Sequence, residues 1–234
     1  MTLPNISGLV THFDATKITN KNNNDDIQQW NDESGNDYHL TQNTTGLRPV
    51  YKTSVQNGLP GVYFSSNGHM GTPTWTTISE PFSAFLVHSS ISPSDGVSWD
   101  SNGGARSFIA RDRTNGTWRI WNGDDFTNHS AVGQTTDILL LSTRWSNTSN
   151  HGYIRFNKGN EVNGSTRNNG IGSIRIAADE GGGRELTGYY CEILLYDRAL
   201  TEQEIEDVED YLWDKWFVEK LDVVGPFPTF RRST

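Results

Sequence analysis

The sequence predicts an all-β protein: a two-sheet antiparallel jelly-roll sandwich with one C-terminal α-helix and an extended C-terminal tail. Three observations support this class. Short runs of strand-forming residues recur along the chain, Asn-Gly and Asp-Gly dipeptides separate many of them, and one segment near the end has helical spacing. The 234 residues fit one large sandwich and can bury a core without disulfide staples.

Six segments carry the clearest strand signal, because they are short and rich in aromatic and β-branched residues. They are residues 82–87, 117–121, 138–145, 153–156, 174–177 and 189–196. Asn-Gly pairs such as Asn57-Gly58 and Asn163-Gly164 tolerate positive φ, so they predict tight turns between strands.

The single helix is predicted over residues 201–217. Thr201 and Glu204 have the capping-box spacing, in which each side chain bonds the backbone N–H of the other residue. Apolar residues then follow at helical spacing: Ile205, Val208, Leu212 and Trp216. We expect this helix to lie across an end or edge of the sheets with its acidic side chains in water. Residues 1–220 are predicted to form one domain, and residues 221–234 an extended arm, because two prolines prevent a helix there.

Charge and cysteine content exclude several classes. The 19 basic and 28 acidic residues give a net charge of −9, and no basic run is present, so nucleic acid is not an expected partner. Cys191 is the single cysteine, which rules out an intramolecular disulfide and indicates a buried thiol. No apolar run approaches membrane-spanning length and Met1 starts no signal-peptide pattern, so we expect neither membrane insertion nor signal-directed export.

Motifs near both ends of the chain resemble one known superfamily. The segments GLVTHFDA and IQQWNDESGN lie in the first part, with Arg48-Pro49 and GLPGVYF after them, and GYYCEILLYDRALTEQEI lies in the second. In this order they are similar to the concanavalin A-like lectin/glucanase superfamily, in its laminin-G-like branch. The resemblance covers about residues 8–64 and 172–216. It implies a sandwich scaffold with Trp30 in the core, but the fold hosts lectins, enzymes and adhesins alike.

The sequence predicts no enzyme. The glucanases implied by the resemblance carry Glu-x-Asp-x-x-Glu on one strand, since retaining cleavage needs two carboxyl groups about 5–5.5 Å apart, and this pattern is absent. The acidic residues at 202–210 lie on the predicted helix, where nothing is expected to raise a carboxyl pKa. Arg111, His129 and Tyr153 could serve a polysaccharide lyase, although a chain of this size offers such a trio by chance. The histidines lack zinc-ligand spacing.

A binding module is the alternative, because aromatic faces stack on sugar rings while amides and carboxylates bond hydroxyl groups. The glycan-binding candidates, expected on or beside loops, are Trp99, Asp100, Asn102, Arg111, Trp121 and Asn122. The tryptophans Trp118 and Trp145 are interpreted instead as core residues. No cofactor is required. Calcium is compatible with the resemblance, with Asp95, Asp124 and Asp125 as weak candidate ligands and solvated carboxylates as the competing interpretation.

The expected function is non-enzymatic surface recognition, as a virion (phage) capsid decoration or tail accessory protein with weak glycan binding. A recognition-type fold without an export signal favours a virion-surface location over an extracellular one. The arm is expected to dock on other virion or lattice subunits, giving an oligomer or array, through Phe227, Phe230, Arg231 and Arg232. Host-surface glycans are further candidate partners, and an undocked tail is the competing interpretation. The alternatives are a free or secreted carbohydrate-binding lectin and a polysaccharide-degrading enzyme.

Overall fold

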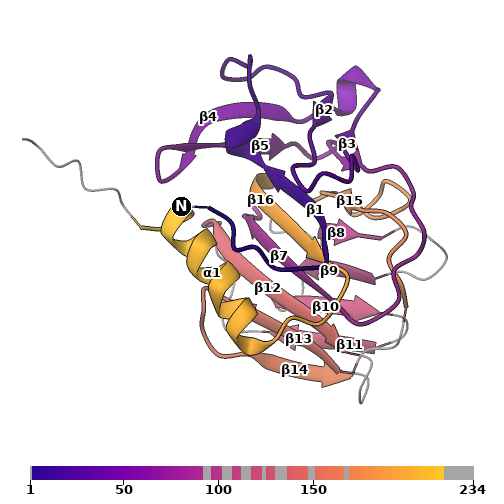
Figure 1. Cartoon of the computed structure of the whole chain (residues 1–234). Helices are drawn as coiled ribbons and strands as arrows, with labels where there is room; N and C mark the ends of the chain where they lie inside the picture. The colour runs from indigo at the N-terminus through magenta and orange to yellow at the C-terminus, as the bar shows by residue number, and fades with distance from the viewer. Residues whose placement is uncertain are drawn as a thin grey trace, which may run out of the picture.

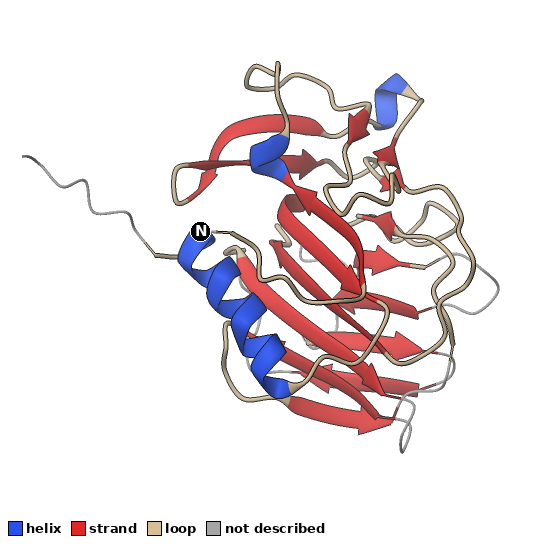
Figure 2. Cartoon of the chain, viewed as in Figure 1, coloured by secondary structure: helices blue, strands red, loops and turns tan. Residues whose placement is uncertain are grey.

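The structure is a computed structural model that describes residues 2–91, 96–101, 107–111, 117–122, 125–129, 136–146, 151–165 and 169–218. Within these ranges the chain forms two antiparallel β-sheets, two short 3₁₀ helices and one α-helix (Figure 2). The 3₁₀ helices are η1 (Ala15–Lys17) and η2 (Thr45–Leu47). The predicted all-β sandwich with one C-terminal helix is therefore confirmed.

The first sheet, sheet A, contains β1 (Leu9–Asp14), β4 (Val50–Gln56), β5 (Leu59–Phe64), β7 (Phe82–His88), β12 (Leu139–Ser146), β13 (His151–Phe156), β14 (Val162–Ser165) and β16 (Gly188–Tyr196). Their order is β14-β13-β12-β7-β16-β5-β4. One half of β16 pairs with β5, and the other half pairs with β1. The strand β16 therefore runs through the centre of this sheet (Figure 1).

The second sheet, sheet B, contains β2 (Gln29–Trp30), β3 (Leu40–Thr41), β6 (Met70–Gly71), β8 (Gly96–Asp100), β9 (Ser107–Arg111), β10 (Trp118–Asn122), β11 (Asp125–His129) and β15 (Arg175–Ile176). Their order is β11-β10-β9-β8-β15-β6-β3-β2. Each of the six predicted strand segments contains a strand, although residues 174–177 form one only at Arg175–Ile176. Of the two Asn-Gly pairs named above, Asn57-Gly58 does join β4 to β5, whereas Asn163-Gly164 lies inside β14, because Asn-Gly tolerates positive φ without requiring it.

The main core lies between the sheets. Trp30, Trp118 and Trp145 are each at most 1% exposed, which confirms the predicted core positions. Cys191 is buried as well, which confirms the predicted buried thiol, and this burial raises the pKa of the thiol. Among the described residues, no helix is long and apolar enough to cross a membrane.

The helix α1 (Glu202–Trp216) covers the outer face of sheet A rather than an end or edge of the sandwich (Figures 1 and 2). Strands β7, β12 and β16 are apolar on both faces, and Phe85, Val87 and Leu140 therefore form a second cluster under the helix. The capping box is confirmed: the Glu204 N–H donates to Thr201 Oγ1, and the Thr201 N–H donates to Glu204 Oε2 at 2.9 Å.

Candidate functional site

Strands β4, β5 and β16 lie beyond the C-terminal end of α1 in sheet A (Figure 1). Tyr63 and Tyr189 are direct partners there on neighbouring strands, so their side chains share one face of the sheet. Their ring centroids lie 5.1 Å apart at an interplanar angle of 48°. Both are half-buried, whereas Val62 and Tyr190 on the opposite face are fully buried. The two rings form an aromatic surface that solvent can reach.

An open pocket with a volume of about 480 Å³ lies beside Tyr189. Its lining comprises residues 54–56, Ser89, residues 136–138 and Tyr189. Ser54, Gln56 and Thr136 supply hydroxyl and amide groups, Asp137 supplies a carboxylate, and Val55 and Ile138 are apolar. This volume lies within the roughly 300–1,000 Å³ that is usual for small-molecule sites.

Hydrogen bonds to backbone groups hold the chain on both sides of the pocket. The Ser89 N–H donates to the Tyr189 carbonyl at 2.8 Å, and the Tyr189 N–H donates to Ser89 Oγ at 3.2 Å. A Cβ atom on Gly188 would lie 2.0 Å from the Ser89 carbonyl oxygen, so this close approach requires glycine. On the other side, Asn57 Nδ2 donates to the carbonyls of Lys215 and Val218, at 3.0 and 2.7 Å. The β4–β5 turn is thereby tied to the end of α1.

The pocket suits a ligand that has apolar faces and many hydroxyl groups. Tyrosine rings offer apolar area with a polar tip, and the surrounding hydroxyl, amide and carboxylate groups can exchange hydrogen bonds with a polyol. A stacked ring that removes about 100 Å² of apolar surface from water contributes roughly 2.5 kcal/mol. Millimolar binding requires about 4 kcal/mol, so one ring together with several hydrogen bonds reaches that range.

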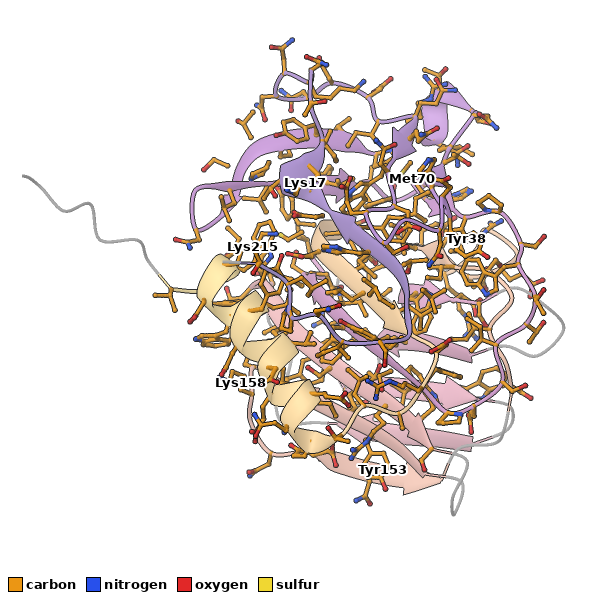
Figure 3. All side chains as sticks on the ribbon, viewed as in Figure 1. Lys17, Tyr38, Met70, Tyr153, Lys158 and Lys215 are labelled. Carbon is orange, nitrogen blue, oxygen red and sulfur yellow. The ribbon has the colours of Figure 1, made fainter. Side chains whose placement is uncertain are left out.

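A buried ionic cluster lies under α1 and has the composition of a metal site. His12, Asp14 and Glu192 place ligand atoms within 4.8 Å of one another, and they are the one such group of three among the described residues. The Lys215 ammonium (Figure 3) lies 2.7 Å from both Asp14 Oδ2 and Glu192 Oε2. Tyr211 and Trp216 also donate to Glu192. The cluster therefore already contains its own cation.

The protonation of Glu192 reflects these contacts. Burial alone would raise the pKa of Glu192, but the hydrogen bonds from His12 and Lys215 lower it below the ordinary glutamate value. A carboxylate that four donors hold in the ionised form is a poor general acid. The cluster stabilises the packing of α1 on sheet A.

A second carboxylate cluster corrects one expectation from the sequence. The acidic residues of α1 do not all face water: Glu209 is 1% exposed, accepts from Ser142 Oγ at 2.5 Å and pairs with Arg155 Nε at 2.9 Å. Burial raises the pKa of Glu209, and it also raises that of the neighbouring Glu161 against the effect of Arg144. The cavity here has a volume of about 10 Å³, which is too small for a sugar ring. In this structure Glu161 and Glu209 therefore contribute to packing and not to a sugar-sized site.

Among the predicted glycan-binding residues whose side chains the structure describes, Trp99, Asp100 and Arg111 are buried. Trp99 is 1% exposed, so its expected surface position is wrong. The carboxylate of Asp100 is fully buried and accepts the N–H groups of Ser101 and Glu180. Arg111 is 5% exposed and donates to the Ser90 carbonyl at 3.3 Å. The polar neighbours that suggested loops belong to the ends of β8 and β9 instead.

Trp121 is half-buried and packs on Val97 and Ala110, on the outer face of sheet B. Of the trio considered for a lyase, Arg111 lies in sheet B and Tyr153 in sheet A, where the Arg144 guanidinium lies 4.4 Å from the Tyr153 ring centroid. His129 ends β11, and its side chain lies outside the described residues.

Several further predictions stay untested. Some of the predicted residues lie outside the described part of the chain: Asn102, Asp95, Asp124 and the arm residues Phe227, Phe230, Arg231 and Arg232. Asn122 ends β10 and Asp125 begins β11, but their side chains are likewise outside the description. The calcium ligands and the docking arm therefore remain predictions from the sequence.

Tyr63 and Tyr189 were not among the predicted site residues, although both lie in the motifs that carry the family resemblance. A signal for them does exist in the sequence. Side chains alternate faces along a strand, so of the adjacent Tyr189 and Tyr190 only one can point into the core. The sequence does not reveal that Tyr63 lies opposite Tyr189, because this pairing joins segments more than 120 residues apart.

No protein-family model matches the sequence, and no curated protein is similar to it at a significant level. Solved structures do share the fold. Domain 4 of AbnA, a GH43 extracellular arabinanase from Geobacillus stearothermophilus in complex with arabinotriose, matches with a TM-score of 0.65 and 13% identity over 86% of this chain and 98% of that domain. A GH54 α-L-arabinofuranosidase matches with a TM-score of 0.61 and 13% identity over 86% of this chain. Trypanosoma rangeli sialidase in complex with sialic acid matches with a TM-score of 0.57 and 12% identity over 89% of this chain.

These matches correct the function expected from the sequence. The present chain spans 53% of the arabinofuranosidase chain and 33% of the sialidase chain. The expected role as a non-enzymatic virion protein is wrong, because the similar structures come from carbohydrate-active enzymes. The same finding contradicts the prediction that the chain is not an enzyme. The missing Glu-x-Asp-x-x-Glu pattern excludes only one of the catalytic arrangements that this fold can carry. At this identity the likeness itself shows a shared β-sandwich fold.

Proposed function

We propose that this chain binds carbohydrate in the open pocket beside Tyr189, on the outer face of sheet A. The observation that carries the proposal is the juxtaposition of the Tyr63–Tyr189 ring pair with a pocket of about 480 Å³ whose walls supply hydroxyl, amide and carboxylate groups. Such a combination matches the alternating apolar faces and hydroxyl edges of a sugar.

The structural neighbours support the same class of ligand. Two of them are complexes with saccharides, one with arabinotriose and one with sialic acid. The arabinanase domain is covered almost completely, at 98%, so the shared unit there is a whole domain. The finer assignment to the laminin-G-like branch of the concanavalin A-like superfamily, and with it a lectin that acts outside the cell, is part of this proposal.

The expected affinity is low for a single site. One or two stacked rings and several hydrogen bonds exposed to water correspond to a dissociation constant of about a millimolar. Attachment to a further binding unit, or assembly of several copies, would raise the effective affinity by orders of magnitude. We therefore expect useful binding to polymeric glycans, on which many sites act together.

The test is calorimetric titration of the full chain with arabinotriose and a panel of neutral and acidic oligosaccharides. Replacing Tyr189→Ala should weaken binding at least about ten-fold, because the stacking surface is lost. Tyr153→Ala is the matched control: it removes a half-buried tyrosine from β13 of sheet A that does not line the pocket and lies far from Lys215 (Figure 3).

Loss of binding in both variants, or in neither, would contradict the proposed site. Chromatography of each titrated oligosaccharide after prolonged incubation adds a separate readout. Released shorter sugars would show that the chain also cleaves its ligand, and would direct attention to Asp137 and to the carboxyl groups under α1.

A further inference from the structure

A second and smaller pocket lies beside η1 and strand β2. Its volume is about 110 Å³, and its described lining comprises residues 17–19, Lys21, residues 29–31 and Glu33. This volume is below the roughly 300 Å³ at which sites for whole small molecules begin, yet it is several times the roughly 30 Å³ that one water occupies in the liquid. This Lys17 pocket is therefore sized for a single functional group and not for a sugar ring.

The Lys17 pocket borders an unused hydrogen-bond donor. Trp30 lines the pocket, although it is only 1% exposed and packs edge-on against Phe13 at 6.0 Å between ring centroids. Its indole Nε1 is buried and, in the part of the chain that the structure describes, bonds to no acceptor. Most buried N–H groups in proteins have a partner, because burying a donor without one is costly. An acceptor bound in the pocket would supply the missing partner.

The described lining of the Lys17 pocket carries more positive than negative charge. Lys17 is the last residue of η1, is exposed, and forms no ion pair with a described carboxylate. The Lys21 ammonium donates to the Asp26 carbonyl at 2.7 Å, which uses one of its three N–H groups. Together with the carboxylate of Glu33, the two ammonium groups give this lining a net charge of +1. This local charge is opposite in sign to the net charge of −9 of the whole chain.

Amide and hydroxyl groups complete the described lining. Gln29 Nε2 donates to Asn31 Oδ1 at 2.9 Å, so the acceptor oxygen of Asn31 is already engaged and its Nδ2 group remains as a donor. Thr19 adds a hydroxyl group. Apart from Glu33, each polar side chain of this lining can donate a hydrogen bond. Such a set of groups favours a ligand that accepts hydrogen bonds and carries negative charge.

We propose that the Lys17 pocket binds an oxyanion group, namely a carboxylate, sulfate or phosphate, through the ammonium groups of Lys17 and Lys21 and the indole N–H of Trp30. Hydrogen bonds to an ionised oxygen are roughly twice as strong as those to a neutral one. Two exposed lysines alone would attract anions without placing them, because water and salt screen surface charges. The buried Trp30 N–H is a fixed donor, and it distinguishes this pocket from a chance pair of lysines. The inference does not depend on carbohydrate binding beside Tyr189.

The test is an NMR titration of the full ¹⁵N-labelled chain, with the assigned indole N–H signal of Trp30 as the reporter. Sodium sulfate, sodium phosphate and sodium acetate are compared with sodium chloride at equal ionic strength. At least one oxyanion should shift the Trp30 signal to saturation, whereas chloride should not. The indole signals of Trp99 and Trp145 should stay in place, because these side chains are equally buried without a described acceptor but do not belong to the lining.

Substitution of the lysine tests the ionic part of the proposal. Lys17→Met should weaken oxyanion binding about five-fold, since a unit charge about 4 Å from the ligand contributes about that factor in water. Lys158→Met is the matched control, because it removes an exposed lysine that lies far from Lys17 (Figure 3). The control should titrate like the wild type.

Titration with glucose 6-sulfate, galacturonate and neutral glucose separates the sources of the oxyanion. Tighter binding of an acidic sugar than of free sulfate or acetate would identify an anionic saccharide as the ligand, and binding no tighter than the free ion would identify a small anion. A Trp30 signal that responds to no oxyanion, responds equally to chloride, or titrates alike in wild type and Lys17→Met would overturn the inference. Tyr189→Ala should leave this titration unchanged, so its failure is independent of a failure of the proposed function.

Discussion

His88 makes the stability of this protein dependent on pH, and the size of the effect follows from its surroundings. Its imidazole is fully buried in β7, stacked on Tyr190 at 5.4 Å between ring centroids and edge-on to Trp118 at 5.0 Å. In the part of the chain that the structure describes, neither ring nitrogen has a hydrogen-bond partner. Burial therefore lowers the pKa of His88 from 6.5 to about 3.

The unfolded chain binds a proton at this histidine below about pH 6.5, whereas the folded chain does so only near pH 3. Because the unfolded state holds more protons in that window, stability due to this group is complete above pH 6.5 and falls as the pH decreases. From these two pKa values, His88 costs about 2 kcal/mol of stability at pH 5 and about 3 kcal/mol at pH 4.

Replacing His88→Phe keeps an aromatic ring and removes the titrating group. The measurement is urea unfolding of wild type and variant at a series of pH values between 7.5 and about 4.5. The free energy of unfolding of the variant should gain about 2 kcal/mol relative to the wild type between pH 7.5 and pH 5, whatever their difference at neutral pH. A half-exposed histidine, His39, provides the control substitution His39→Asn. A difference between His88→Phe and wild type that stays constant with pH would refute the reasoning.

Two further substitutions probe the contacts that place α1 and the pocket. Lys215→Met should lower the free energy of unfolding by about 3 kcal/mol, because it leaves the buried carboxylates of Asp14 and Glu192 without their cation. Lys158→Met removes the exposed ion pair with Asp210 and should lower the free energy of unfolding by less than about 1 kcal/mol. Equal losses for Lys158→Met and Lys215→Met in urea unfolding would contradict this expectation. Gly188→Ala should destabilise by about 2 kcal/mol or more and weaken saccharide binding, since its Cβ meets a backbone oxygen of Ser89. Gly46→Ala, which meets nothing within 4 Å, should leave the melting temperature and the titration nearly unchanged.

Local patterns could be predicted from the sequence, and long-range partners could not. The capping box at Thr201 and the turn at Asn57 depend on residues within four positions of each other, so their side-chain chemistry determines them. The position of α1 depends instead on which strands are apolar on both faces. The sequence of one segment does not show which of its neighbours in the fold are such strands. The polar neighbours Ser98 and Asp100 favour a surface position for Trp99 in the sequence, yet both neighbours are fully buried in the structure. Polar residues beside a tryptophan therefore do not distinguish a loop from the end of a buried strand.

The contacts of Glu192 show the same limit, because its four donors come from the distant strand β1 and from α1. Pairing with β1 places Asp14 opposite Glu192 and His12 opposite Leu194, which puts the side chains of His12 and Asp14 on the helix-covered face. No spacing along the chain predicts that a histidine near the N-terminal end and a lysine near residue 215 meet at one carboxylate.

An irregularity in β16 explains how one strand serves the core, the pocket and the contact with α1. Simple alternation would put Glu192 on the same face as Tyr190, whose hydroxyl lies in the main core and donates to the Ser98 carbonyl at 2.7 Å. The pairing with β7 instead shifts register between Tyr190 and Glu192, so that Tyr190 lies opposite His88 and Glu192 opposite Val87. A bulge of this kind re-aims the residues that follow it. Tyr189 faces the pocket before the bulge, and Glu192 faces Lys215 as a consequence of the bulge. The carboxylate thus reaches its donors under α1 rather than an apolar core that could not hold it.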